Sequence, residues 1–99
     1  MMKRIALAAT FLPLFASQAV LAGPECTKEP KDKWLSELDM QKKLVGEMNY
    51  IIYKFKTTDG NCYEIYGKGF KKDSTTEMQE VEIYFNPVDA SIVKEKVEG

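Results

Sequence analysis

The chain of 99 residues contains no histidine and only two cysteines, Cys26 and Cys62. It therefore lacks the side chain that most often acts as a general base or metal ligand near neutral pH. Two distant cysteines do not form the clustered spacing of a zinc site. No serine or threonine stands beside a candidate base in a known motif, and the glycines form no phosphate-binding loop. These gaps predict a protein that is not an enzyme and holds no metal or cofactor.

The chain also lacks an excess of positive charge. Its 14 lysines and arginines stand against 15 acidic residues, so the formal net charge is −1. A weakly acidic chain whose basic residues are not interleaved with aromatics is poorly suited to nucleic acid or to an anionic membrane surface. We therefore expect no nucleic-acid partner.

A long apolar run occurs only at the N-terminus. Lys3 and Arg4 precede it, and the small residues Val20 and Ala22 occupy the positions typical of a processing site. This is the pattern of a secretory signal peptide. The sequence predicts cleavage after Ala22 and a single domain over residues 23–99. The domain would carry 12 basic and 15 acidic residues, a net charge of 12 − 15 = −3.

A transmembrane anchor is the alternative for this apolar run. The run is short, is interrupted by Pro13, and ends in small residues rather than a basic stop. A membrane-spanning helix needs about 20 apolar residues. We therefore expect a periplasmic or secreted protein with no stable membrane insertion after cleavage.

The two cysteines are candidates for a disulfide bond, Cys26–Cys62. An exported protein enters an oxidising compartment, where such a pair tends to close. A covalent link would also support a domain this small, whose single core is marginal. A redox-active pair is the alternative reading, although the spacing is far from Cys-x-x-Cys.

One helix is predicted within the stretch from Trp34 to Asn49. Ser36 is a suitable N-cap, Leu35 and Met40 fit the spacing of a hydrophobic staple, and Asn49 suits a left-handed ending. The residues expected to face the core are Leu38, Leu44, Val45 and Met48.

Four strands are predicted after the helix, because β-forming residues alternate with polar ones between turn residues. The predicted strands are about 51–56, 62–66, 79–85 and 91–96, and residues 67–77 would form a long mobile loop. Connections this short require antiparallel pairing. The fold class is therefore α+β, with one N-terminal helix packed on a four-stranded antiparallel sheet.

The two faces of this sheet are expected to differ. The face toward the helix would carry Ile51, Tyr53, Phe55, Tyr63, Ile65, Val81, Ile83 and Phe85. The opposite face would present Ile52, Lys54, Lys56, Glu64, Tyr66, Glu80, Glu82 and Tyr84. That mixed face either lies in solvent or binds another protein, because tyrosine beside charge is favoured at interfaces. The candidate protein-binding residues are Ile52, Lys54, Tyr66, Glu82 and Tyr84.

Two stretches, "NCYEIYG" and "VEIYFNPVDASIV", resemble parts of PepSY-like domains, as do the early Cys26 and "KWLSELDMQKKL". The similarity is to the short exported single-domain form and spans nearly the whole mature chain. Two departures stand out, the long stretch "GKGFKKDSTTEMQ" and Asn49 where a glycine usually ends the helix. The resemblance implies this α+β fold, a disulfide between the cysteines and no catalytic residues.

The resemblance also implies a role, because PepSY modules occur in protease propeptides and a restraining or binding role has been proposed for them. The expected function is binding of another envelope protein, such as a peptidase, at the mixed sheet face or at a sheet edge. Two alternatives remain open: a carrier of a small envelope ligand between helix and sheet, and a redox protein.

Overall fold

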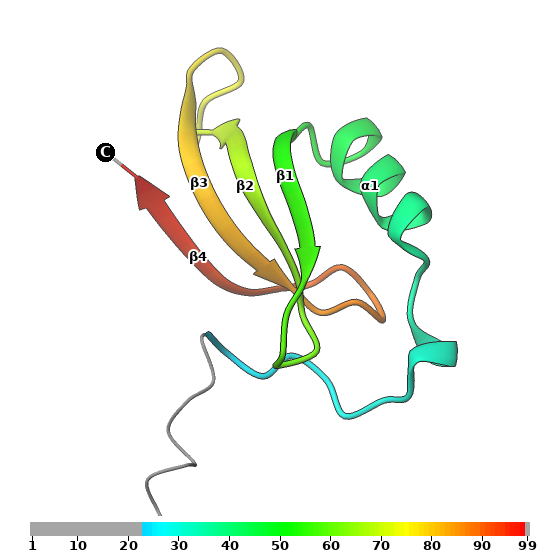
Figure 1. Ribbon diagram of the computed structural model, residues 1–99. Helices are drawn as coiled ribbons and strands as arrows, with labels where there is room; N and C mark the ends of the chain where they lie inside the picture. Colours follow the sequence, from blue (N-terminus) through cyan, green and yellow to red (C-terminus); the bar gives the residue numbers. More distant parts are fainter. Residues whose placement is uncertain (1–22, 99) are drawn as a thin grey trace, which may run out of the picture.

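The structure is a computed structural model that describes residues 23–98. The predicted signal peptide lies outside the described residues. The described part contains a short 3-10 turn η3 (Lys31–Lys33), one helix α1 (Glu37–Gly46) and the strands β1 (Ile51–Thr57), β2 (Tyr63–Phe70), β3 (Met78–Phe85) and β4 (Ile92–Glu98). All neighbouring strands pair antiparallel in the order β1-β2-β3-β4 (Figure 1). The predicted α+β class is confirmed.

Helix α1 packs on one face of this sheet, which we term the helix face; the opposite face is the outer face. The helix begins as predicted, because the Ser36 Oγ accepts the Asp39 N–H at 3.0 Å. Its buried stripe is narrower than predicted and consists of Met40 and Leu44. Leu38, 62% exposed, points away from the sheet.

Val45 is likewise exposed, so two of the four predicted core positions of the helix were wrong. An i, i+4 pair is enough to cover this small sheet, so Leu38 and Val45 remain in solvent, whereas Met48 packs against the core as predicted. The chain leaves the helix through Asn49 in the left-handed conformation (φ 63°), as predicted. Tyr50 then turns back, and its N–H donates to the Leu44 carbonyl at 3.0 Å.

The prediction of which side chains at the start of β1 point toward the helix was also wrong. The ladder with β2 is irregular between Ile52 and Lys54, which places an extra residue, Tyr53, in β1. An extra residue of this kind shifts the alternation of side chains. Ile52 therefore packs against the core, whereas Ile51 and Tyr53 are exposed. After the irregularity, Phe55 returns to the helix face.

Gly67 gives a physical reason for this bulge. It lies opposite Ile52, and a Cβ on it would collide with the Ile51 carbonyl. The missing side chain therefore lets the two backbones approach closely. Gly69 plays a related role, because the Tyr50 ring lies against its Cα.

The connection between β2 and β3 is shorter than predicted. Residues 67–70 continue β2, so that only Lys71–Glu77 form the loop. The Lys71 N–H donates to the Glu77 carbonyl at 2.8 Å, and the Ser74 Oγ accepts the Glu77 N–H at 2.9 Å. The two glycines of "GKGF" misled the prediction, since glycine usually weakens a strand.

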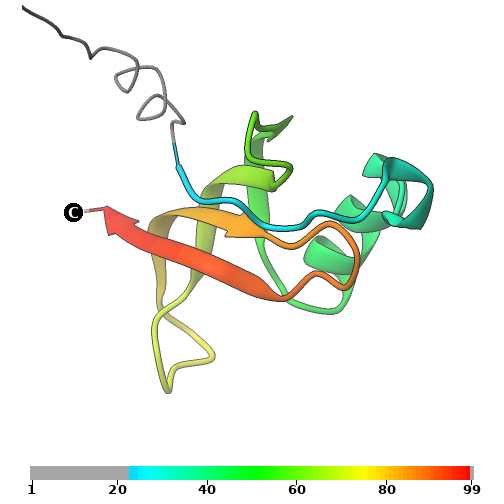
Figure 2. The same ribbon diagram turned by 90° about the horizontal axis from the view of Figure 1, so that it is seen from below.

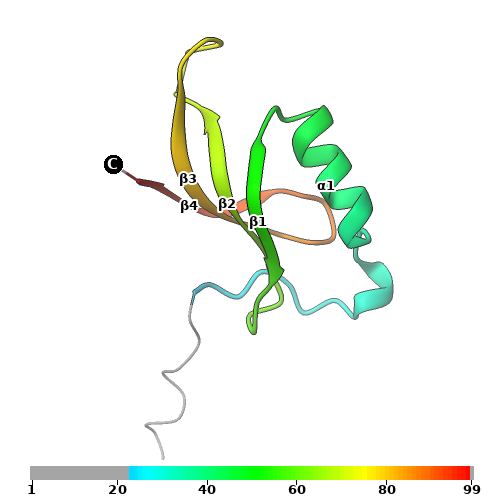
Figure 3. The same ribbon diagram turned by 45° about the horizontal axis from the view of Figure 1, so that its top comes forward.

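The core lies between α1, the helix face and the turn after β3. Its buried members are Met40, Leu44, Tyr63, Ile65, Val81, Ile83, Phe85 and Ala90. Trp34 closes one end, packing edge-on against Tyr63 with ring centroids 5.6 Å apart. Figure 3 shows the turn between β3 and β4 passing beneath the helix. Within residues 23–98, no helix is long and apolar enough to span a membrane.

Candidate functional site

The structure separates the five residues of the predicted binding face. Lys54 and Tyr66 pair across β1 and β2 on the outer face, and both are exposed. Ile52 lies on the helix face because of the bulge. Glu82 and Tyr84 are on the outer face as predicted, but each is only 7% exposed. A surface built from all five therefore does not exist.

A hydrogen-bonded cluster occupies the centre of the outer face. The Glu82 Oε2 atom accepts two phenolic O–H groups, from Tyr66 at 2.9 Å and from Tyr84 at 3.0 Å. The Lys96 Nζ lies 3.5 Å from the Glu82 Oε1, and the Lys56 Nζ lies 3.7 Å from Glu64. Each of the four strands thus contributes a side chain. We term Lys56, Glu64, Tyr66, Glu82, Tyr84 and Lys96 the outer-face cluster.

The tripeptide Glu-Ile-Tyr occurs twice, and the two copies build the middle of this cluster. In β2 and β3 the copies pair antiparallel about Ile65 and Ile83. Glu64 consequently lies opposite Tyr84, and Tyr66 lies opposite Glu82. Opposite residues point to the same face. The repeat is the signal in the sequence that could have revealed the cluster.

The two carboxyl groups of the cluster have opposite electrostatic surroundings. Glu64 is 2% exposed, and its Oε2 has no hydrogen-bond partner within residues 23–98 when both carboxyls are ionised. Burial, followed by a hydrogen bond to Glu82, raises the pKa of Glu64. The hydrogen bond from Glu64, together with those from Tyr66 and Tyr84, lowers the pKa of Glu82 to about 2. One shared proton between the two carboxyls accounts for both directions.

The tyrosines of the cluster are held in their neutral form. The hydrogen bond to Glu82 raises the pKa of Tyr66 to about 12. Burial, and then the same acceptor, raises the pKa of Tyr84 far above its usual range. Both phenols therefore remain donors to Glu82 throughout the physiological pH range.

Residues 23–30 form an N-terminal arm that passes close to the end of β3 (Figure 2). Gly23 lies against the Tyr84 ring, so closely that a Cβ at this position would be 2.9 Å from the Cε2 atom. The Cys26 N–H donates to the Gly60 carbonyl at 2.9 Å, and the Asn86 side chain donates to the Cys26 carbonyl at 3.1 Å. The contact between Gly23 and the Tyr84 ring explains in part why Tyr84 is buried.

The disulfide Cys26–Cys62 fixes the arm in place, as predicted. Cys62 is fully buried, and the bond joins the arm to the residue just before β2. A buried sulfur is poorly accessible to attacking thiolates, which favours a structural over a redox-active role.

Comparison with known protein families shows to which family the chain belongs. The family model for peptidase propeptide and YPEB domains, PepSY_2, matches residues 5–96. The chain belongs to this family. The match spans almost the whole sequence and confirms the resemblance seen in the motifs. No curated protein and no solved structure matches the chain.

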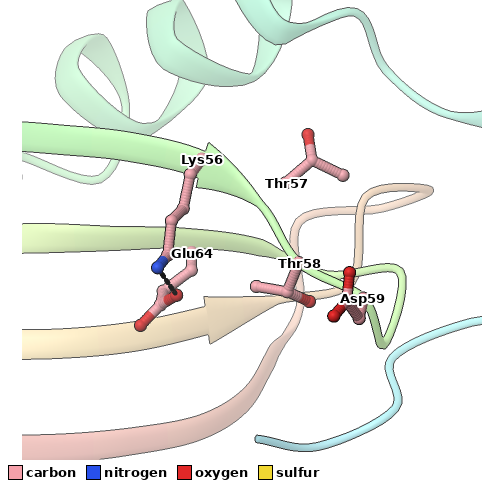
Figure 4. Close-up of a pocket in the computed structure, with 5 residues that line it drawn as sticks. All are labelled: Lys56, Thr57, Thr58, Asp59 and Glu64. Carbon is pink, nitrogen blue, oxygen red and sulfur yellow. Dashed lines mark ion pairs between the residues drawn. The ribbon is translucent and has the colours of Figure 1, made fainter. Parts of the chain in front are cut away.

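The PepSY domain has two small surface hollows beside the first hairpin. One of about 160 Å³ is lined by Lys56, Thr57, Thr58, Asp59 and Glu64 (Figure 4). The other, of about 380 Å³, lies where the arm meets the turn after β1. Binding pockets for small molecules are mostly apolar and deeply enclosed. Both hollows are open and mainly polar, so they offer little to an apolar ligand.

The space between helix and sheet is filled in this PepSY domain. Leu44, Ile65, Ile83 and Phe85 have no exposed surface there. Close packing of this kind leaves no room for a carried ligand without displacement of the core. Within residues 23–98 no group of three or more metal-ligating side chains converges, and both thiols are engaged in the disulfide.

Proposed function

We propose that this protein is an exported, non-catalytic PepSY module that binds a peptidase of the bacterial envelope and modulates its activity. The observation that carries the proposal is the family match, because peptidase propeptides belong to the same family. A propeptide acts by contact with its enzyme and needs no chemistry of its own. The pattern of the first residues, with a basic start and a small-residue cleavage site, supports export.

The contact surface proposed for this role is the exposed part of the outer face. Lys54, Tyr66 and Phe70 lie there, and Tyr66 is 37% exposed. Tyrosine contributes large rigid contact area and a polar group, which favours it at interfaces. The buried cluster beneath holds the Tyr66 hydroxyl in one position, which lowers the entropy lost on binding.

A pull-down with the purified residues 23–99 tests the proposal. The tagged domain is incubated with an envelope extract of its source cells, and peptidases are identified by mass spectrometry and assayed with and without the domain. We expect one peptidase to be enriched and its activity to change. Failure to enrich any peptidase, or enrichment without a change of activity, contradicts the proposal.

Matched variants test the surface. Lys54→Ala removes an outer-face side chain without touching the hydrogen bonds of Glu82, whereas Lys72→Ala removes an exposed lysine of the distant loop. We expect Lys54→Ala and Tyr66→Ala to reduce recovery and Lys72→Ala to leave it unchanged. Equal recovery with all forms, each checked for folding by circular dichroism, excludes this face.

A further inference from the structure

The two edges of the sheet differ in how far they are covered. At the β1 edge, α1 runs alongside the strand, and the bulge at Tyr53 interrupts the regular ladder (Figure 3). At the other edge, β4 pairs only with β3, and all seven of its residues are exposed. A terminal strand keeps a row of unpaired N–H and C=O groups along its free side. Within residues 23–98, β4 is thus the more accessible place for another strand to add.

The side chains of β4 give this edge a defined chemical pattern. Lys94 and Lys96 lie opposite Tyr84 and Glu82, which places both lysines on the outer face. Val97 lies opposite Val81, on the helix face. The outer face of β4 therefore presents the two lysines followed by Glu98, and the helix face presents Ile92, Glu95 and Val97. Each lysine repels a basic side chain that stands directly opposite it on an added strand and attracts an acidic one.

A second copy of the chain fits this edge poorly. A two-fold axis that pairs β4 with the β4 of another copy keeps every residue on its own face of the sheet. When the two strands overlap along their full length, this axis passes through Glu95, the middle residue of β4. Glu95 would then face the Glu95 of the copy, and Lys94 would face the Lys96 of the copy on both sides of the axis. Like charges directly opposite each other destabilise a strand pair. At full overlap, which allows the most main-chain hydrogen bonds, the charges therefore favour a different chain.

We propose that β4 binds an extended segment of another protein as a fifth strand, in which acidic side chains face Lys94 and Lys96 and alternate with apolar ones. Main-chain hydrogen bonds would supply the affinity and the lysines the selectivity. The bound strand would continue the outer face that carries Tyr66. The inference rests on the proposed function and names the class of segment that the partner would insert.

Two synthetic peptides test the edge directly. Both have eight residues; one alternates valine with glutamate and the other alternates valine with lysine. Amide hydrogen exchange of residues 23–98 is followed by NMR as each peptide is added. We expect the glutamate peptide to slow exchange in β4 and to bind about twofold tighter or more than the lysine peptide, because the two pairs with Lys94 and Lys96 outweigh the single pair with Glu98.

Matched lysine variants sharpen the test. Lys94→Glu should reverse the preference between the two peptides, whereas Lys54→Glu, on the same face at the β1 edge, should leave it unchanged. Equal binding of both peptides, protection of β1 instead of β4, or no protection at all overturns the inference. So does sedimentation as a dimer whose β4 amides are already protected, because a second copy would then be the occupant.

The outcome can be separated from that of the proposed function. If a peptidase is enriched equally by the wild type and by Lys94→Glu, the proposed function stands and the β4 edge is not its contact. If the glutamate peptide binds β4 but no peptidase is enriched, the edge stands and the peptidase role fails.

Discussion

The two faces of the sheet are both closed at their centres, but by opposite chemistry. On the helix face, Leu44, Ile83 and Phe85 exclude water with apolar side chains. On the outer face, Glu64 and Glu82 are almost as buried, yet they are carboxyl groups that bond to tyrosines and lysines. Alternation along a strand therefore tells which face a residue occupies, but not whether that face meets solvent.

The difference has an energetic consequence. Burial of apolar surface stabilises the fold by roughly 25 cal/mol per Å² without any demand on orientation. Buried carboxyl groups must recover the cost of leaving water through well-placed partners. We therefore expect the helix face to supply most of the stability. The outer face should contribute less and should make stability depend on pH and on which single partner is removed.

The largest expected effect comes from a cavity on the helix face. Leu44→Ala should lower the free energy of unfolding by about 2–5 kcal/mol, because Leu44 is fully enclosed. Leu38→Ala, on the exposed side of the same helix, should change it by about 0.5 kcal/mol or less. Urea unfolding followed by circular dichroism measures both. Similar losses for the two variants would show that α1 does not pack as described.

A smaller effect is expected from the outer face. Glu82→Gln leaves a neutral amide where two phenols and Lys96 require an anion, and should lower the free energy of unfolding by about 1–3 kcal/mol. Glu80→Gln, the exposed outer-face carboxylate two residues earlier, serves as the control. Its effect should stay within about 0.5 kcal/mol. If the two variants unfold alike, the cluster makes no net contribution.

The subtlest effect is a dependence on pH. The pKa of Glu64 is raised in the fold, so its contribution to stability is present in acid and is lost as the pH rises through that pKa. The pKa of Glu82 is lowered to about 2, so its contribution is present above its ordinary value and is lost as the pH falls toward 2.

Glu64→Gln isolates the first of these contributions. Its amide can donate to Glu82 as the protonated acid does, but it does not ionise. We expect the wild type to lose stability relative to Glu64→Gln as the pH is raised from about 4 to about 8. Unfolding curves measured across this range test the expectation. A constant difference between the two proteins would mean that no proton is shared.

The order and type of the elements could be predicted because local signals agree with the fold. Ser36 caps the helix, Asn49 ends it in the left-handed conformation, and Asn86-Pro87 closes β3. The facing of single residues could not be predicted where tertiary structure decides it. The bulge at Tyr53 depends on Gly67, which lies 15 residues beyond Ile52 and stands opposite Ile52 only in the fold.

The candidate site was predictable only in part, for a related reason. The sequence placed Lys54, Tyr66, Glu82 and Tyr84 on the outer face, which the register of β1 to β3 confirms. Their burial depends on partners from distant segments, such as Gly23 against Tyr84 and Lys96 beside Glu82. Pattern along one strand carries no information about such partners. The disulfide was predictable, because two cysteines allow only one pairing within the chain.

The repeated Glu-Ile-Tyr tripeptide also acts on how the sheet assembles. A slip of β2 against β3 by two residues in one direction would place Glu64 directly opposite Glu82. A slip by two residues in the other direction would place Tyr66 opposite Tyr84, and Glu64 would then have no tyrosine opposite it. A slip by one residue would turn Ile83 toward solvent. Only the native alignment lets each carboxyl meet a phenol. The seven-residue loop between β2 and β3 fixes the register of the two strands only weakly by its length. The repeated tripeptide therefore favours the native register over slipped ones.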